Sequence, residues 1–353
     1  MAVKLVFVTQ TLDPKHGSLA QTLDLVRSLA ERVDQVVVLC RTVSWEEIPA
    51  NVEVRTFDAR GKAGRALAFE RELGSSLRGA DAVLVHMVPT FAALAAPLAR
   101  ARRVPVLLWY AHWHASRSLR LATRLADRVL SVDTSSFPLQ TAKLTGIGHA
   151  IDVQAFAPPT AARPEGPLRL LAFGRTARWK GLATLLDAFE SLDGDASLEL
   201  RGPSLTPDEV EHRAELMQRA AADGRVSVEP PVPRAAVPAL LAGVDVVVSP
   251  AEPRAGATLD KAVYEAAACE RPVVTTNAAL APFLAGLALD LVAPARDAPA
   301  LAATLGAVIA ASPQTRAEIG AELRRRVVRE HSLEHWADAV IRVVREVRSA
   351  RGG

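Results

Sequence analysis

Short apolar runs alternate with longer stretches of mixed apolar and polar residues along most of the chain. The short runs are hydrophobic at nearly every position, which is typical of strands buried on both faces of a parallel sheet. The first half of the chain contains KLVFVT (4–9), QVVVLC (35–40), AVLVHM (82–87), PVLLWY (105–110) and RVLSVD (128–133). The second half contains LRLLAF (168–173), SLELRG (197–202), RVSVE (225–229), VDVVVS (244–249) and PVVTTN (272–277).

Helical patterns separate these runs, and alternating strands and helices predict a doubly wound α/β fold. The helical stretches are 17–31, 181–191, 207–222, 234–242, 258–269 and the tail 297–349. The segment AFAPPTAARPEGP (155–167) interrupts the series, because its prolines fit neither a helix interior nor a central strand. We therefore predict Rossmann-like domains at 1–155 and 168–330, a linker at 156–167, and a C-terminal helix at 331–353.

Composition and charge add modest constraints. Hydrophobic residues make up 50% of the 353-residue chain and charged residues 23%, which is a normal globular balance. The net charge is +3, with 19 Lys and Arg against 14 Asp and Glu in residues 1–155. This excess is too small to predict nucleic-acid binding. Cys40 and Cys269 form no CxxC motif, so a disulfide framework and a structural zinc site are not expected.

No apolar run is long enough for a signal sequence or a membrane span, so we expect a cytoplasmic protein. A stripe of Arg117, Arg120, Arg124 and Arg128 follows helical spacing. It predicts either a basic face that rests on anionic lipid at the inner membrane surface or an ordinary solvated helix face.

The stretch FGRTARWKG (173–181) combines glycine and positive charge between a strand and a helix. Gly174 and Gly181 allow close approach of the backbone to a ligand, and Arg175 and Lys180 supply charge for phosphate oxygens. The start of a helix also favours anions. The GxxxxGK[ST] order of a nucleotide-binding P-loop is missing. The stretch predicts a diphosphate site, and a solvated basic turn is the alternative.

Several motifs in order along the chain resemble the retaining glycosyltransferases of family 4, which have the two-domain GT-B fold. They are GRTARWKG, LELRGPS (198–204), VPRAAVPALLAGVDVVVSPAE (232–252), YEAAACERPVVTTN (264–277) and GHAIDVQAF (148–156). The resemblance covers nearly the whole chain and is strongest over 168–277. It implies two Rossmann-like domains that face each other across a cleft. The first would bind the acceptor, the second the nucleotide-sugar, and the C-terminal helix would pack back on the first.

The resemblance also implies roles for residues of the second domain. Arg175 and Lys180 would hold the donor diphosphate and stabilise the leaving group, and Glu265 would bind the ribose hydroxyls. The other donor-binding candidates are Gly174, Gly202, Gly256, Thr258, Asp260 and Lys261. The family has a second glutamate eight residues before Glu265, where this chain has Ala257. Glu252, Asp260 and Lys261 are the candidate substitutes.

In the first domain, the resemblance places His112 beside the transferred sugar. His86 and His114 are alternatives on the acceptor side. Gly17 is the one glycine left of the family's glycine-rich turn, and Ser18 could instead cap a plain helix. The three histidines lack the carboxylate or cysteine spacing of a metal site, so we expect no metal.

The expected activity is metal-independent transfer of a sugar from a nucleotide-sugar donor to an acceptor hydroxyl, with retention of anomeric configuration and no cofactor. The acceptor would be a glycan, a lipid-linked molecule or a small molecule in glycan biosynthesis. A catalytically degenerate GT-B partner protein is an alternative, because of Ala257. A nicotinamide-dependent oxidoreductase is less favoured, because TQTLDPKHG follows the first strand in place of GxGxxG.

Overall fold

The computed structural model describes residues 3–14, 16, 19–160, 166–252 and 260–352. It divides the chain into two compact units. Unit 1 consists of residues 1–150 and 330–353, and unit 2 consists of residues 151–329. Each unit is built on a parallel sheet with helices between successive strands, so the predicted α/β fold class is confirmed.

Unit 1 contains a seven-stranded parallel sheet in the order β5-β3-β1-β6-β7-β8-β9. The interior strand β1 pairs with β3 on one side and with β6 on the other, so that Leu5 lies between Val36 and Ala82. The strands are β1 (Lys4–Val8), β3 (Gln35–Cys40), β5 (Val52–Thr56), β6 (Ala82–His86), β7 (Val106–Trp109), β8 (Arg128–Ser131) and β9 (Leu144–Gly146). Two short strands, β2 (Thr11–Leu12) and β4 (Thr42–Val43), pair separately.

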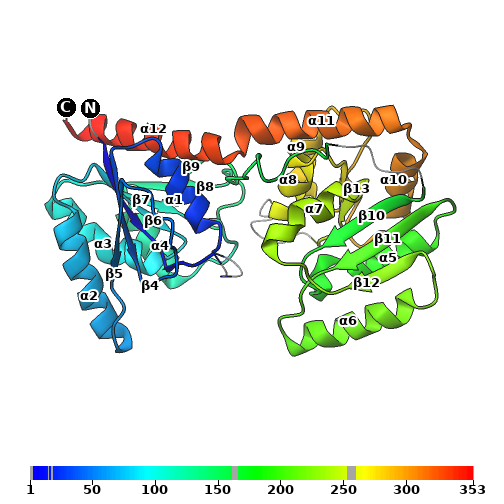
Figure 1. The fold of residues 1–353 in the computed structure, drawn as a ribbon, viewed down its shortest axis with the longest axis horizontal. Coiled ribbons are helices and arrows are strands. Elements are labelled where there is room, and N and C mark those ends of the chain that lie inside the picture. Colours follow the sequence, from blue (N-terminus) through cyan, green and yellow to red (C-terminus); the bar gives the residue numbers. More distant parts are fainter. Residues whose placement is uncertain (1–2, 15, 17–18, 161–165, 253–259, 353) are drawn as a thin grey trace. The chain divides into compact units, whose positions relative to one another are not determined.

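The helices of unit 1 include one from the C-terminal end of the chain. They are α1 (Thr22–Ala30), α2 (Gly61–Ser76), α3 (Pro89–Ala101), α4 (Arg117–Leu125) and α12 (Leu333–Gly352). Helix α12 lies beside α1 (Figure 1) and buries Trp336 completely. The Trp336 ring meets Trp109 of β7 edge-on, with 5.8 Å between ring centroids. Arg348 of α12 also pairs with Asp81 at 2.8 Å. The predicted C-terminal helix therefore corresponds to an integral part of unit 1.

Unit 2 contains a five-stranded parallel sheet in the order β12-β11-β10-β13-β14. The strands are β10 (Leu168–Phe173), β11 (Ala196–Arg201), β12 (Val226–Glu229), β13 (Val246–Ser249) and β14 (Val273–Thr275). The α-helices are α5 (Leu182–Glu190), α6 (Pro207–Ala220), α7 (Val237–Ala242), α8 (Lys261–Ala268), α9 (Ala281–Leu284), α10 (Ala298–Ala310) and α11 (Pro313–Glu330). The 3-10 turns in the described part of unit 2 are η1 (Arg178–Lys180), η2 (Arg234–Ala236) and η4 (Ala278–Leu280).

Each sheet has a point where the strand order reverses. In unit 1 the chain moves outward from β1 through β3 to β5 and then returns to begin again at β6. In unit 2 it moves from β10 through β11 to β12 and then returns to β13. Connections leave in opposite directions at such a point, and ligands of open α/β sheets bind there, outside the carboxyl ends of the strands.

The boundary between the units lies earlier than the sequence predicts. Residues 151–155 were expected in the first domain and 156–167 in a linker, but unit 2 begins at Ile151. Ile151, Val153 and Phe156 are buried in the hydrophobic core of unit 2. Arg324 of α11 also donates to the backbone oxygens of Phe156 at 3.0 Å and Val153 at 3.2 Å. The packing of unit 2 thus begins before the proline-rich composition does.

Two helices of unit 1 differ from the sequence expectation. Helix α1 begins at Thr22 with Gln21 as its N-cap, and Ser18, the predicted cap, lies outside the described residues. Helix α4 ends at Leu125, and Arg128 begins β8, so the stripe of four arginines is reduced to Arg117, Arg120 and Arg124 on the helix. All three are exposed on α4. Contact of this face with a membrane stays a prediction.

Lowering the pH from 7 to 5 should destabilise unit 1, because two of its buried histidines resist protonation. Burial lowers the pKa of His86 to about 3 and that of His331 to about 4. The unfolded chain takes up these protons below its pKa of about 6.5 and the folded chain does not, so stability is full above that pH and falls below it. At 1.36 kcal/mol per pH unit, the loss by pH 5 is about 2 kcal/mol for each histidine.

Urea unfolding at the two pH values, followed by tryptophan fluorescence, measures this loss, because four of the five tryptophans belong to unit 1. His86 stacks on Phe7 with 5.7 Å between ring centroids. The substitution His86→Phe keeps an aromatic ring there and should remove about half of the pH dependence. An unchanged pH dependence in His86→Phe would contradict the assignment.

Candidate functional site

The turn after β10 is tightly folded around two glycines. Gly174 has a φ of +144° and Gly181 a φ of +67°, a region that side chains disfavour. Gly181 ends η1 and is the N-cap of α5. A Cβ atom at Gly181 would lie 2.0 Å from the backbone oxygen of Pro250, which follows β13. Glycine is therefore required at this position, where the chain passes from β10 across the end of β13.

The loop after β11 packs directly on this turn. A Cβ atom at Gly202 would lie 1.6 Å from the backbone oxygen of Gly174, so backbone contacts backbone here. The backbone N–H of Gly174 donates to the oxygen of Arg201 at 2.9 Å. The backbone N–H of Thr176 donates to the oxygen of Pro203 at 3.1 Å. The structure thus brings together two of the predicted donor-binding glycines, Gly174 and Gly202.

Lys180 lies over the same turn and reaches the end of β13. Its Nζ is 3.3 Å from Oδ1 of Asp260, and the two side chains are only 18% and 11% exposed. Ser249, the last residue of β13, donates its hydroxyl hydrogen bond to Oδ2 of Asp260. The Nζ atom also lies 5.0 Å from the ring centroid of Trp179. Lys180 and Asp260, 80 positions apart in sequence, therefore meet where the strand order of unit 2 reverses.

Arg175 leaves the turn in another direction and pairs with Glu209 of α6. Its guanidinium donates twice to the Glu209 carboxylate, which also accepts from the backbone N–H of Leu205 at 2.6 Å. Burial raises the pKa of the Glu209 carboxyl, but the hydrogen bonds from Leu205 and Arg175 outweigh it, and the net pKa is lowered. Arg175 and Lys180, expected on one diphosphate, are thus each paired with a different carboxylate.

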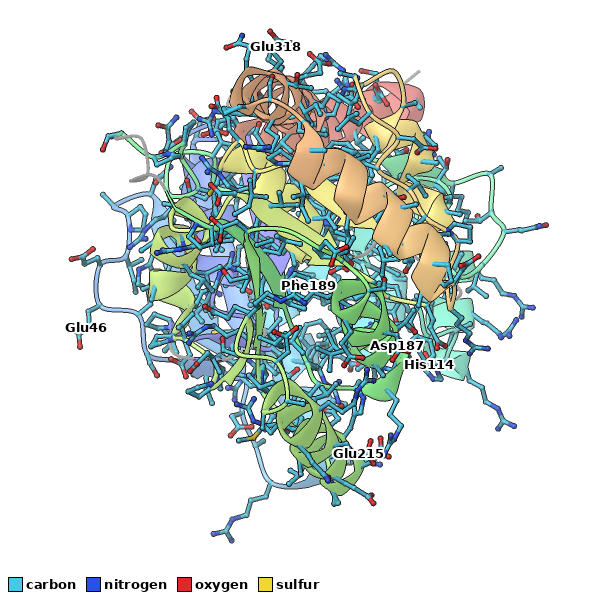
Figure 2. All side chains as sticks on the ribbon, turned by 90° about the vertical axis from the view of Figure 1, so that its right-hand side faces the viewer. Glu46, His114, Asp187, Phe189, Glu215 and Glu318 are labelled. Carbon is cyan, nitrogen blue, oxygen red and sulfur yellow. The ribbon has the colours of Figure 1, made fainter. Side chains whose placement is uncertain are left out.

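Arg178 occupies the exposed side of the turn. It pairs with Asp208 at 3.1 Å and with Glu215 at 2.8 Å, both on α6. Figure 2 shows the Glu215 side chain projecting from the outer side of α6, whereas Phe189 of α5 lies in the interior. Arg178 therefore contributes surface charge on the same turn as Lys180. A substitution of Arg178 can serve as the control for the same substitution of Lys180.

Glu265, the predicted ribose ligand, is a buried carboxylate of α8. Its side chain is 3% exposed and accepts two hydrogen bonds from Arg234, at 2.8 and 2.6 Å. Lys261, one helical turn earlier, lies 3.5 Å away. The Arg234 guanidinium lies 4.8 Å from the ring centroid of Phe156. A carboxylate has about four lone-pair sites, so Glu265 retains acceptor capacity beyond Arg234.

Arg234 and Glu209 are the residues of this site that the sequence did not single out. Arg234 lies in the segment VPRAAVP, and its partner Glu265 is 31 positions further on. Glu209 is 34 positions from Arg175. No spacing rule connects residues so far apart, and only the approach of separate loops brings them together. Gly17, Gly256 and Thr258, together with Ala257, lie outside the described residues.

A family model and several solved structures match this chain. Residues 167–311, which include the whole β10–β14 sheet, match the family model for glycosyl transferases group 1. No curated protein matches the chain in sequence.

Solved structures match the chain over nearly its full length. Anabaena HepE, in complex with UDP and glucose, has a TM-score of 0.75 at 17% identity, with 98% of this chain and 100% of that chain covered. The chain has the GT-B fold. Sucrose-phosphate synthase from Thermosynechococcus elongatus matches with a TM-score of 0.74 at 19% identity, covering 99% of this chain and 100% of that one. A glycosyltransferase from Rickettsia africae matches with a TM-score of 0.75 at 13% identity, covering 98% of each chain. At these identities, the likeness is one of fold.

His112 is the GT-B candidate for contact with the transferred sugar, and it lies in the exposed segment after β7. Its Nδ1 accepts a hydrogen bond from the backbone N–H of His114 at 3.1 Å. Burial and the neighbouring His114 lower the pKa of His112, so the ring is neutral at pH 7. Because Nδ1 accepts, the proton of the neutral ring is on Nε2, which can donate to a hydroxyl.

The other two acceptor-side histidines differ in exposure. His86 is buried against Phe7, and its Nδ1 lies 3.4 Å from the hydroxyl of Thr9. His114 is exposed, and its backbone oxygen accepts a hydrogen bond from the Tyr110 hydroxyl at 2.9 Å. The structure therefore places His112 and His114 in one segment and His86 in the core of the sheet.

Within the described ranges, no three side chains of His, Cys, Asp or Glu gather closely enough to hold a metal ion. Among the same residues, no helix combines the length and the apolar character needed to cross a bilayer.

Proposed function

We propose that the protein transfers a sugar from a nucleoside diphosphate sugar to an acceptor hydroxyl, without a metal ion and with retention of anomeric configuration. The observation that carries the proposal is the position of Lys180. This half-buried cation lies over a glycine turn, beside the start of α5, where the strand order of unit 2 reverses. Such a position suits the diphosphate of a nucleotide.

The chemistry requires stabilisation of the leaving group. When the bond between the anomeric carbon and the diphosphate oxygen breaks, the nucleoside diphosphate gains negative charge. The Nζ atom of Lys180 lies 3.3 Å from the Asp260 carboxylate. In the complex it would contact the phosphate oxygens in place of that carboxylate. Arg175, whose side chain is 43% exposed, could likewise turn from Glu209 toward an anion. These two cations would perform the neutralisation that a metal ion performs in other transferases.

The nucleoside and sugar contacts follow from the same loops. Glu265 would accept hydrogen bonds from the ribose hydroxyls with the lone pairs that Arg234 does not use. Asp260 and Lys261 follow Ala257, the position of the missing family glutamate, in the sequence, and Asp260 is the candidate for sugar hydroxyls. His112 would donate to a hydroxyl of the transferred sugar from Nε2. Uridine is the first base to test, because the HepE structure contains UDP.

Calorimetry and thermal unfolding of the full chain test the donor site. UDP at 100 times its dissociation constant should stabilise the protein by about 2.7 kcal/mol, while uridine at the same concentration should have little effect. EDTA should not change the binding of UDP. Equal effects of UDP and uridine would contradict a diphosphate site.

Transfer of the labelled sugar then separates an enzyme from a degenerate GT-B partner protein. The anomeric configuration of the product, measured by NMR, tests retention. If UDP, GDP and ADP sugars all bind but none is hydrolysed or transferred, then the protein is the degenerate partner.

A further inference from the structure

A cavity of about 570 Å³ lies at the edge of the unit 1 sheet where the strand order reverses. Gln10 follows β1, Arg41 directly follows β3, and Val88 follows β6, and all three line the cavity. Its position in unit 1 matches that of Lys180 in unit 2, at the carboxyl ends of the strands. Its volume lies within the range of small-molecule sites.

One side of this cavity is positively charged. Arg41, Lys62 and Arg65 line it, and Arg41 is partly neutralised by Asp58 at 3.3 Å. Lys62 and Arg65 make no ion pair with any other residue that the structure describes. Both lie in the first turns of α2, which contain no acidic residue. Cations near the start of a helix oppose its macrodipole, so helix stability does not explain them. An anionic ligand does.

Another part of the cavity lining is apolar. Val88, Phe91 and Leu94, at and near the start of α3, form this wall. Phe91 is held by an edge-on contact with Phe57, with 5.0 Å between the ring centroids. A ligand that fills the cavity therefore meets both cationic side chains and hydrocarbon.

We propose that this cavity binds an amphiphilic phosphate: a phosphate ester on Arg41, Lys62 and Arg65, with its apolar group against Phe91 and Leu94. A group of arginine and lysine side chains binds a doubly charged phosphate ester better than it binds a ligand with a single carboxylate. Resting on the function proposed above, this molecule is the acceptor. A hydroxyl elsewhere on it would form the new bond to the anomeric carbon as the bond to the nucleoside diphosphate breaks, and its proton would leave with the diphosphate.

Calorimetry of the full chain with octyl phosphate tests the binding. Lys62→Gln and Arg65→Gln should each weaken it by about tenfold, because each removes one charge-assisted contact. The matched control is Arg71→Gln, which removes the same charge from the same helix. Arg71 is 78% exposed, pairs with Glu72 and does not line the cavity, so its variant should bind like the parent.

Inorganic phosphate and glucose 6-phosphate test the contribution of the apolar residues and distinguish a lipid-like acceptor from a soluble one. Leu94→Ala should weaken octyl phosphate about tenfold and leave inorganic phosphate unchanged. Octyl phosphate binding tighter than glucose 6-phosphate indicates a lipid-like acceptor, and the reverse indicates a soluble sugar phosphate with an apolar ring face on the wall. The proposal is overturned if neither ester binds, or if the Lys62→Gln/Arg65→Gln double variant binds both like the parent. UDP binding to the same variants is measured separately, so failure of the donor site is distinguished from failure of this one.

Discussion

Replacing Lys180 with alanine should lower the rate of sugar transfer by about 30- to 1000-fold. Loss of a charged hydrogen bond to a desolvated phosphate costs about 2–4 kcal/mol in the transition state, at 1.4 kcal/mol per tenfold change in rate. The Lys180 side chain is 18% exposed and lies over the Gly174 turn, so water replaces its charge poorly. Affinity for UDP should fall as well, while affinity for uridine should remain the same. Steady-state kinetics and calorimetry measure both.

Arg178→Ala is the control for this experiment. Arg178 is on the same turn, but it is 49% exposed and pairs with two exposed carboxylates of α6. Its loss should change transfer by less than about threefold, since surface ion pairs contribute little. Arg175→Ala is a poorer test, because it also leaves the buried Glu209 without its cation. Parent-like UDP affinity in Lys180→Ala would show that the turn is only a basic surface loop.

Replacing Arg234 with alanine should lower the free energy of unfolding of unit 2 by about 3 kcal/mol. The substitution leaves the Glu265 carboxylate, 3% exposed, without the guanidinium that donates to both its oxygens. Breaking a buried ion pair from one side is costly, because the remaining charge stays desolvated. Urea unfolding followed by circular dichroism measures the loss.

Two further variants identify the cause. Adding Glu265→Gln to Arg234→Ala removes the stranded charge and should restore part of the stability. Arg219 pairs with Asp187 and Glu190 on the surface, so Arg219→Ala should cost less than about 1 kcal/mol. If Arg234→Ala were no more destabilising than Arg219→Ala, then Glu265 would be well solvated and the ion pair unimportant.

The sequence was sufficient for strands that are buried on both faces. The run LRLLAF coincides with β10, and QVVVLC coincides with β3. Strand β5, with the sequence VEVRT, was missed because it lies at the sheet edge and only Val52 of its five residues is buried. Helix α2 was missed because only Phe69, Leu73 and Ser76 of its 16 residues are buried, which leaves a weak periodic pattern. Burial on both faces thus favoured prediction, although β12, none of whose residues is fully buried, was also predicted.

The candidate site was predictable only where its residues are neighbours in sequence. Gly174, Lys180 and Gly181 lie within one turn, so their chemistry could be inferred from a short motif. The ion-pair partners of these side chains could not be inferred in this way, since Asp260 is 80 positions from Lys180 in sequence. Ion pairs between distant loops depend on how strands and helices pack, and periodicity contains no information about that.

The inclusion of α12 in unit 1 has a consequence for biosynthesis. All residues of unit 2 are synthesised before α12, so unit 2 needs no later segment to fold as a whole. Unit 1, although its first 150 residues emerge earlier, must wait for the last helix to cover Trp109 with Trp336. The unit whose synthesis begins first is therefore completed only after all of unit 2 has been made. A premature stop codon near residue 330 would leave the older half of the protein unfinished and open to chaperones and proteases.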